Sequence, residues 1–166
     1  MTSSENPILV LIDVDPSGYV ASSTAALLGA ASTIGSPVAL IVGGSPAAVD
    51  QAAAAGASVV LTADGDPAAL TVPIVDALQA AAAQVRPDAV LISNSISGRD
   101  VAGRFAVRTK SALSVDAVGV SRDDEGVLAH HSVYGGAYLV DSAPTFGTPV
   151  ITVRQGAVDA RAEAVP

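Results

Sequence analysis

The chain has 166 residues, half of them hydrophobic, which fits one domain with a large core. Its 16 acidic and 8 basic residues give a formal charge of -8, which repels phosphate backbones and anionic lipid, so we expect no nucleic-acid partner and no membrane insertion. The absence of cysteine excludes disulfides and thiolate metal sites and agrees with a reducing, cytoplasmic location.

The first two-thirds of the sequence alternates apolar strands with helices. Ile8–Ile12 is apolar throughout, which is typical of a strand covered on both faces, and it is too short for a signal core or a membrane span. Further strands are predicted at Val38–Val42, Val59–Leu61 and Ala89–Ile92, and helices at Val20–Ile34, Ala47–Ala55, Leu70–Val85 and Arg99 to about Ala112. This order predicts an α/β fold, a three-layer αβα sandwich with a doubly wound, mostly parallel sheet.

After Ser114 the pattern becomes richer in strands and turns. Val115–Ser121, Val127–Val133 and Val150–Val153 read as strands, and Asp123–Gly126 as a hairpin loop, so we expect an antiparallel β addition to the sheet. The predicted domain covers residues 1–156. Residues 157–166 are small, charged and alanine-rich with nothing to bury, and we interpret them as an interdomain linker or a frayed tail.

The loop Ser93–Asp100 is the most suggestive candidate site. It follows a buried strand at its carboxyl end and leads into a helix, which is where doubly wound folds hold ligands. Exposed amides at the helix start, together with Arg99, would favour an anion. We favour a plainer interpretation, in which Gly98 turns the chain and Arg99 or Asp100 pairs across a protein interface.

Two other loops attract attention but carry weaker signals. Gly43–Pro46 lacks both the G-x-G-x-x-G spacing and the lysine of a P-loop, which favours an ordinary strand-turn-helix connection. Asp13, Asp15 and Asp64–Asp66 lie in turn-rich segments, where aspartate bonds its own backbone. No serine lies in a nucleophile elbow, so the sequence predicts no catalytic residue.

The β-rich section contains two further candidates. His130 and His131 are neighbours in a strand and point to opposite faces, so they cannot share one metal ion, and an edge-strand or interface role is expected for both. Tyrosines flank a glycine pair in Tyr134–Tyr138, and such a segment suits a contact surface or burial at a sheet edge. The candidate interface residues are Gly98, Arg99, Asp100, Tyr134, Gly135, Gly136 and Tyr138.

Several segments together resemble one family. Ala55–Leu61 is similar to an "A-G-A-x-x-V" motif, Ser97–Ala106 to "G-R-D/N-x-x-x-R-x-A", Ser114–Val118 to "x-x-D-V", Tyr134–Ala137 to "Y-A-G-N-A" and Val150–Ala157 to "V-x-T-V-R-P-G-x". In this order they resemble the amino-terminal domain of the electron-transfer flavoprotein alpha subunit. Ala137 and Tyr138 stand where the family has Asn and Ala, and Gln155 replaces Pro, so contacts there are expected to differ.

The resemblance implies an adenine nucleotide alpha hydrolase-like fold and a scaffold domain with no active site of its own. It implies pairing with the beta subunit. FAD would be held mostly by a carboxyl-terminal alpha domain beyond this sequence, and AMP by the beta subunit, so we expect no cofactor in this chain alone. The parent complex takes electrons from dehydrogenases such as those of fatty acid β-oxidation and passes them to a quinone oxidoreductase. Without its partner, the domain would expose apolar surface and could form a homodimer.

Two alternatives stay open from the residues. A nucleotide-binding domain of the universal-stress-protein type has a similar layered architecture and would use the Ser93–Asp100 loop for phosphate. A small enzyme with a serine or carboxylate site is the other, although no constellation of residues supports it.

Overall fold

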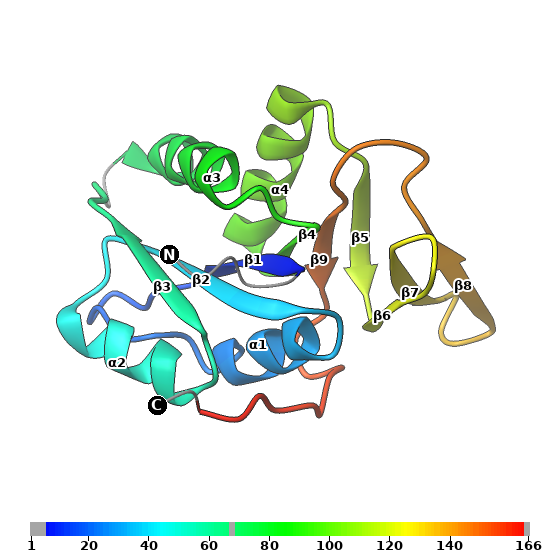
Figure 1. Ribbon diagram of the computed structural model, residues 1–166, viewed down its shortest axis with the longest axis horizontal. Coiled ribbons are helices and arrows are strands. Elements are labelled where there is room, and N and C mark those ends of the chain that lie inside the picture. Colours follow the sequence, from blue (N-terminus) through cyan, green and yellow to red (C-terminus); the bar gives the residue numbers. More distant parts are fainter. Residues whose placement is uncertain (1–5, 67–68, 165–166) are drawn as a thin grey trace.

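The computed structural model describes residues 6–66 and 69–164. In these residues a six-stranded sheet lies between two pairs of helices, and a three-stranded sheet stands beyond one edge (Figure 1). The large sheet has the order β3-β2-β1-β4-β9-β5, and all its pairings are parallel. Its strands are β1 (Pro7–Ile12), β2 (Ser36–Val42), β3 (Val59–Ala63), β4 (Ala89–Ser93), β5 (Leu113–Ala117) and β9 (Val150–Val153).

Each face of the sheet has its own hydrophobic core, because successive side chains of a strand point to opposite faces. Ile8, Val10 and Ile12 of β1 pack toward α1 (Thr24–Ser32) and α2 (Pro46–Ala54). Leu9 and Leu11 pack toward α3 (Val72–Val85) and α4 (Ile96–Thr109). Burying each such side chain stabilises the fold by about 1.5–3 kcal/mol. The predicted three-layer, doubly wound architecture is confirmed.

The last strand differs from the sequence prediction. β9 does not join an antiparallel addition; it lies between β4 and β5 and runs parallel to both. The antiparallel strands form a separate sheet, ordered β6 (Gly119–Arg122), β7 (Val127–Val133) and β8 (Tyr138–Ser142). The expected antiparallel placement of Val150–Val153 is therefore wrong. A short apolar run fits either kind of sheet, and its pairing depends on residues far away in the sequence.

The predicted strand Val115–Ser121 is divided between the two sheets. Asp116 has φ 62, and the register of β5 against β9 shifts between Ser114 and Ala117. At this irregularity the chain leaves the large sheet and enters β6, where Val118 donates its amide to the His130 carbonyl at 2.7 Å. The bend places the small sheet beyond β5.

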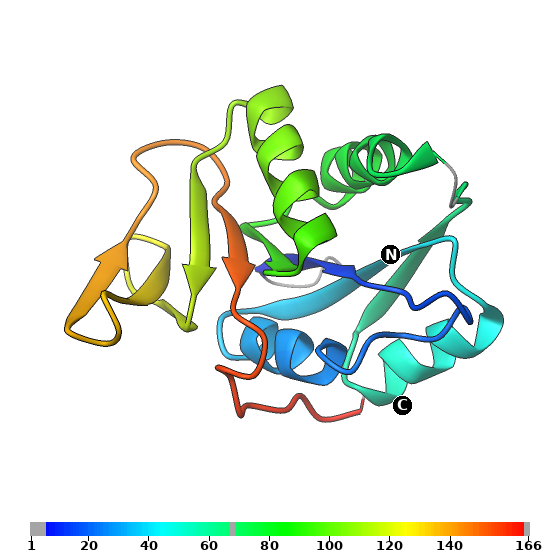
Figure 2. The same cartoon turned by 180° about the vertical axis from the view of Figure 1, so that it is seen from behind.

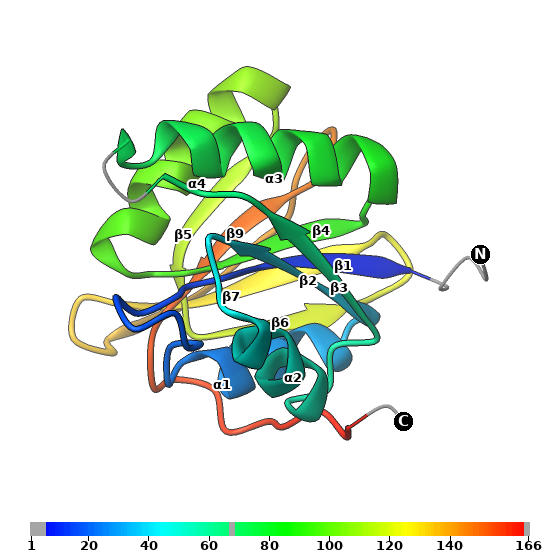
Figure 3. The same ribbon diagram turned by 90° about the vertical axis from the view of Figure 1, so that its left-hand side faces the viewer.

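The carboxyl-terminal segment also differs from expectation. Residues 157–164 run back along the outer side of α1 and α2, as Figures 2 and 3 show from two directions. Val158 packs against the buried cluster between the sheet and these helices. The interpretation that this segment has nothing to bury is therefore wrong, while its role as a linker stays a prediction. Val165 and Pro166, which end the predicted tail, lie outside the described residues.

None of the helices in the described ranges is both long and apolar enough to cross a membrane.

Candidate functional site

Polar side chains meet where β4, β5 and β9 approach their carboxyl ends. Asn94 donates its side-chain amide to Asp116 Oδ1 at 2.8 Å. Thr152, which is fully buried, donates to Asn94 Oδ1 at 3.0 Å and accepts the Asp116 amide at 2.9 Å. These bonds join three strands at one edge of the sheet.

Arg154 completes this network. Its Nε donates to Asp116 Oδ1 at 3.0 Å and its Nη2 to Asp116 Oδ2 at 2.6 Å, while Nη2 also reaches the Ser132 carbonyl at 3.2 Å. The hydrogen bonds from Arg154 are the main reason that the pKa of Asp116 lies below its usual value. Because the polar groups of Asn94, Asp116, Thr152 and Arg154 bond to one another, the network is suited to holding strands in place rather than to proton transfer. Sequence analysis did not single out this network, although Asn94 and Arg154 each directly follow a buried strand.

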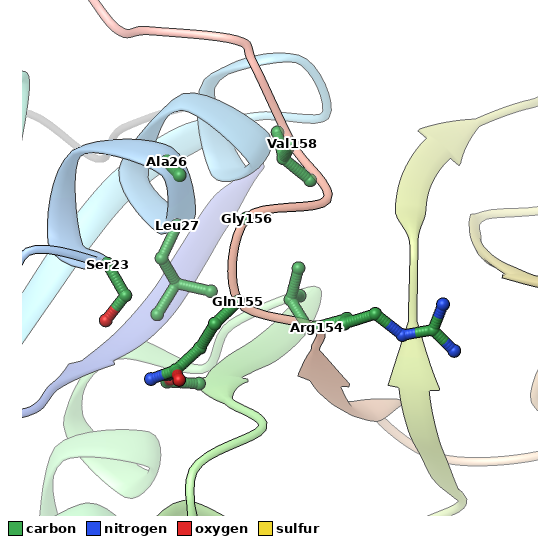
Figure 4. Close-up of a pocket in the computed structure, with 9 residues that line it drawn as sticks. Ser23, Ala26, Leu27, Arg154, Gln155, Gly156 and Val158 are labelled. Atoms are coloured by element: carbon green, nitrogen blue, oxygen red, sulfur yellow. Dashed lines mark hydrogen bonds between the residues drawn. The ribbon is translucent and has the colours of Figure 1, made fainter.

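A small cavity lies on the other side of Arg154. Figure 4 shows Gln155 pointing toward α1 and Arg154 pointing away toward β5. Gln155 donates its side-chain amide to Ser93 Oγ at 3.0 Å. The cavity has a volume of about 10 Å³, which is room for a single water molecule and too little for a cofactor.

The crevice between β1 and β4 is the topological switch point, where a doubly wound fold would hold a ligand. One cavity of about 270 Å³ there is lined in part by Asp13, Ser97 and Gly98. A neighbouring cavity of about 430 Å³ is lined in part by Asp15 and Asp66. Burial raises the pKa of Asp13, and a hydrogen bond from Ser95 partly opposes that rise. Carboxylates thus stand where an anion site would need positive charge, which argues against phosphate.

The glycine loop after β2 is hydrogen-bonded to the loop after β1. Ser45 donates both its amide, at 3.0 Å, and its hydroxyl, at 2.7 Å, to the Gly18 carbonyl. Asp15 accepts the amides of Ser17 and Tyr19 at 2.8 and 3.1 Å, which is the turn chemistry predicted for that aspartate. These contacts agree with an ordinary strand-turn-helix connection.

Gly98 lies inside α4. The interpretation from the sequence, in which Gly98 turns the chain, is therefore wrong. Ser95 caps the helix by accepting the Gly98 amide at 3.0 Å. A Cβ at Gly98 would lie 2.0 Å from the Ser93 carbonyl oxygen, so glycine allows the helix to approach β4 closely. Gly98 is buried and is therefore not itself available for a surface contact.

Arg99 and Asp100 lie on the exposed side of α4. Asp100 accepts a hydrogen bond from the Thr71 hydroxyl. Both of its carboxylate oxygens also lie 3.0 Å from Arg104 Nε, which donates to them. The Thr71 hydrogen bond, followed by that of Arg104, lowers the pKa of Asp100. Asp100 is thus hydrogen-bonded within its own chain although it is exposed, and the guanidinium of Arg99 is the better candidate for a contact with a partner.

The segment Tyr134–Tyr138 forms the turn between β7 and β8. Tyr134 is 84% exposed and Tyr138 is 63% exposed, and their rings meet edge-on with centroids 5.8 Å apart. Gly135 and Gly136 have φ values of 66 and 89, which favour glycine. Leu139, in the following strand, is 83% exposed. The turn and the start of α4 stand apart in Figure 1, so the candidate interface residues do not form one patch.

The β8 strand presents an open edge. It pairs with β7 on one side, and the sheet has no further strand on the other side within the described residues. Such an edge offers unpaired backbone groups to another chain.

Both histidines tie β7 to its neighbours. His130 shares hydrogen bonds of 2.6 Å with Asp141 and 2.8 Å with Ser121, and His131 one of 2.8 Å with Ser142. In the parts of the chain that the structure describes, no three His, Cys, Asp or Glu side chains gather as metal ligands.

Comparison with known proteins gives the family. A family model described as "Electron transfer flavoprotein domain" matches residues 8–165. The chain belongs to this family. The resemblance drawn from the sequence motifs is confirmed.

Curated members of the electron transfer flavoprotein family extend the match. Over 158 residues the chain is 40% identical to "Electron transfer flavoprotein subunit alpha" of Mycobacterium leprae (strain TN), covering 92% of this chain and 48% of the relative. The same figures hold for the subunit alpha of Mycobacterium tuberculosis (strain ATCC 25618 / H37Rv). "Protein FixB" of Salmonella typhimurium is 39% identical over 75 residues, which is 44% of this chain and 23% of the relative. The chain thus spans about half the length of the subunit alpha relatives.

One departure of this electron transfer flavoprotein domain from the motif has a structural consequence. Gln155 stands where proline was expected, and its side chain reaches Ser93. A proline has no side-chain donor and could not make this contact.

Proposed function

We propose that this chain is the amino-terminal scaffold and docking domain of an electron-transfer flavoprotein alpha subunit. It pairs with a beta subunit, and the complex carries electrons from dehydrogenases to a quinone oxidoreductase. The observation that carries the proposal is identity of 40% along 92% of the chain, since it reaches far beyond the motifs alone. A cytoplasmic location stays a prediction.

The scaffold role is supported by the chemistry at the carboxyl edge of the sheet. Asn94, Asp116 and Arg154 are engaged with one another, which leaves no free acid or base among them. The cavities of the switch point carry Asp13, Asp15 and Asp66, which oppose the pyrophosphate of FAD and the phosphate of AMP. These residues do not fit either nucleotide, and we propose that the chain alone holds neither.

The docking surface that we propose centres on β8 and the turn before it. Tyr134, Tyr138 and Leu139 expose apolar area beside an open strand edge, a combination that suits a protein partner. Arg99 would make a separate contact from α4.

The test is calorimetric titration of the purified chain with a beta subunit, with FAD and with AMP. We expect binding to the beta subunit and no binding to either nucleotide. Leu139→Asp should weaken beta binding about tenfold or more, because it places a charge at the centre of an apolar contact. Val72→Asp is the matched control, since Val72 is 44% exposed but lies on α3, which carries neither proposed contact.

Two results would contradict the proposal. Failure of the chain to bind a beta subunit would remove the docking role. Tight AMP or ATP binding by the chain alone would instead support the universal-stress-protein alternative.

A further inference from the structure

Residues 159–164 follow a strict two-residue alternation. Alanine occupies positions 160, 162 and 164, and charged residues occupy positions 159, 161 and 163. The burial follows the same alternation up to Glu163: Ala160 and Ala162 are half-buried, while Asp159, Arg161 and Glu163 are exposed; Ala164 is exposed as well. This is the pattern of an extended segment with one face against the protein and one face in water.

Two glycines on the helices receive this segment. A Cβ at Gly29, in the middle of α1, would lie 2.0 Å from the Ala160 carbonyl oxygen. A Cβ at Gly56, directly after α2 and its cap, would lie 2.3 Å from the Ala162 Cβ. Both glycines are buried. Each therefore leaves a notch into which residues 160–163 fit.

Gly29 is unfavourable for its helix by itself, because glycine inside a helix lowers stability by about 0.5–1 kcal/mol relative to alanine. Gly56 has φ 99 and is also favoured by its backbone conformation. Gly29 has no left-handed φ, so backbone conformation does not explain it. The close approach of Ala160 does.

Side-chain and backbone packing hold this segment. Val158 packs against the cluster between the sheet and α1. Within the described part of the chain, the backbone hydrogen bond of residues 157–164 is local, from the Ala157 amide to the Arg154 carbonyl at 3.3 Å. A segment held by packing at its start and by two notches can detach without unfolding the sheet.

We propose that the outer surface of α1 and α2 is a binding groove for an extended peptide with small residues at every second position, occupied in cis by residues 157–164. Gly29 leaves room for the backbone at Ala160, and Gly56 leaves room for the Ala162 side chain and so favours a small residue there. The docked segment runs along α1 toward α2, on the side of the sheet opposite α3 and α4 (Figure 1). This inference does not depend on the electron-transfer assignment.

Trypsin cleavage after Arg161 reports docking in the full chain. Arg161 is exposed but lies within the docked segment, so cleavage requires local opening. We expect the native chain to be cut there about tenfold or more slowly than a synthetic peptide of residues 156–166. Gly29→Ala should raise the cleavage rate toward that of the peptide, because the new methyl group occupies the position of the Ala160 carbonyl.

Gly103→Ala is the matched control, since a Cβ at this glycine of α4 would meet nothing within 4 Å. Val158→Asp tests the same docking by a change in the segment itself and should also speed cleavage. Asp159→Asn, at an exposed position of the segment, should not. Circular dichroism would establish that each variant is folded. If Gly29→Ala does not fold, the cleavage rate of Val158→Asp tests the docking instead. Cleavage of the native chain as fast as the peptide would overturn the proposal, and so would rates unchanged by the substitutions that disrupt docking.

Discussion

Arg154 holds the Asp116 carboxylate through two hydrogen bonds, with Nε 3.0 Å from Oδ1 and Nη2 2.6 Å from Oδ2. Asp116 lies in β5 and Arg154 directly follows β9, so the ion pair joins the last two strands of the large sheet. Asp116 also has the left-handed backbone at which the chain bends toward the small sheet. The pair therefore fixes both a strand pairing and a change of direction.

Replacing Asp116 with Asn should destabilise the domain at neutral pH by about 1 kcal/mol, a modest loss because the pair is partly exposed. Asn tolerates the left-handed conformation, so the change removes charge more than it strains the backbone. Because the pKa of Asp116 is lowered below 3.8, its contribution is present above that pH and is lost as the pH falls through the folded-state pKa. Urea unfolding should show that the unfolding free energies of the wild type and the variant converge in strongly acidic solution. A difference that does not change with pH would contradict an origin in the Asp116 charge.

Asp13→Asn should act in the opposite direction and stabilise the domain at neutral pH. Burial raises the pKa of Asp13 above 3.8, so the folded state is penalised whenever this carboxylate is ionised. The asparagine oxygen can still accept the Ser95 hydrogen bond. The gain in unfolding free energy should be present once the pH exceeds the folded-state pKa and disappear below pH 3.8, where the wild-type group is protonated in both states. A loss of stability at neutral pH would show that the charge itself is needed.

Gly98→Ala should cost about 1–3 kcal/mol of unfolding free energy, since the added methyl group would collide with the Ser93 carbonyl and force α4 away from β4. Gly103→Ala, in the same helix, should instead add about 0.5–1 kcal/mol. Denaturant midpoints of the two variants measure the contrast. Similar effects of both substitutions would mean that helix propensity, and not the close approach, governs position 98.

The open edge of β8 should let the isolated domain self-associate when no partner is present. Val140→Lys places a charge on this strand, and charged edge residues oppose pairing with another chain. Sedimentation velocity should show a dimer of the unmodified chain at high concentration and a monomer of the variant, with Val107→Lys on α4 remaining dimeric. A monomeric unmodified chain would contradict the prediction.

The sequence is most informative where burial on both faces of a strand makes the hydrophobic run continuous. β1, β2 and β4 were predicted within a few residues, because their apolar runs end at turns and glycines. β9 has the same apolar character, yet its place between β4 and β5 follows from pairings such as Val90 with Val150, which local pattern does not reveal. Tyr138–Ser142 was not predicted as a strand, because Tyr138 and Leu139 are exposed and carry no one-sided alternation.

For the candidate site and for residues 159–164, prediction from the sequence was limited for a different reason. Gly98 suggested a turn, but glycine serves close packing as readily as a turn, and only the distance to Ser93 distinguishes the two. The alternation in residues 159–164 was present in the sequence, but with alanine as the inward residue it gives a weak hydrophobic signal. The network of Asn94, Asp116 and Arg154 joins residues from three strands, so it becomes visible only when the strand order is known.

The position of β9 bears on how the domain is made. Within the described residues β5 pairs with β9 and with no other strand of the large sheet, so a nascent chain that ends before residue 150 has a finished β3-β2-β1-β4 half and a β5 with no strand to pair with. Ribosomal synthesis must release Val150–Val153 before the sheet can close, and the contact between Val90 and Val150 requires a long loop to form first. We therefore expect the final folding step to wait for the last part of the chain, with β5 exposed to chaperones until then.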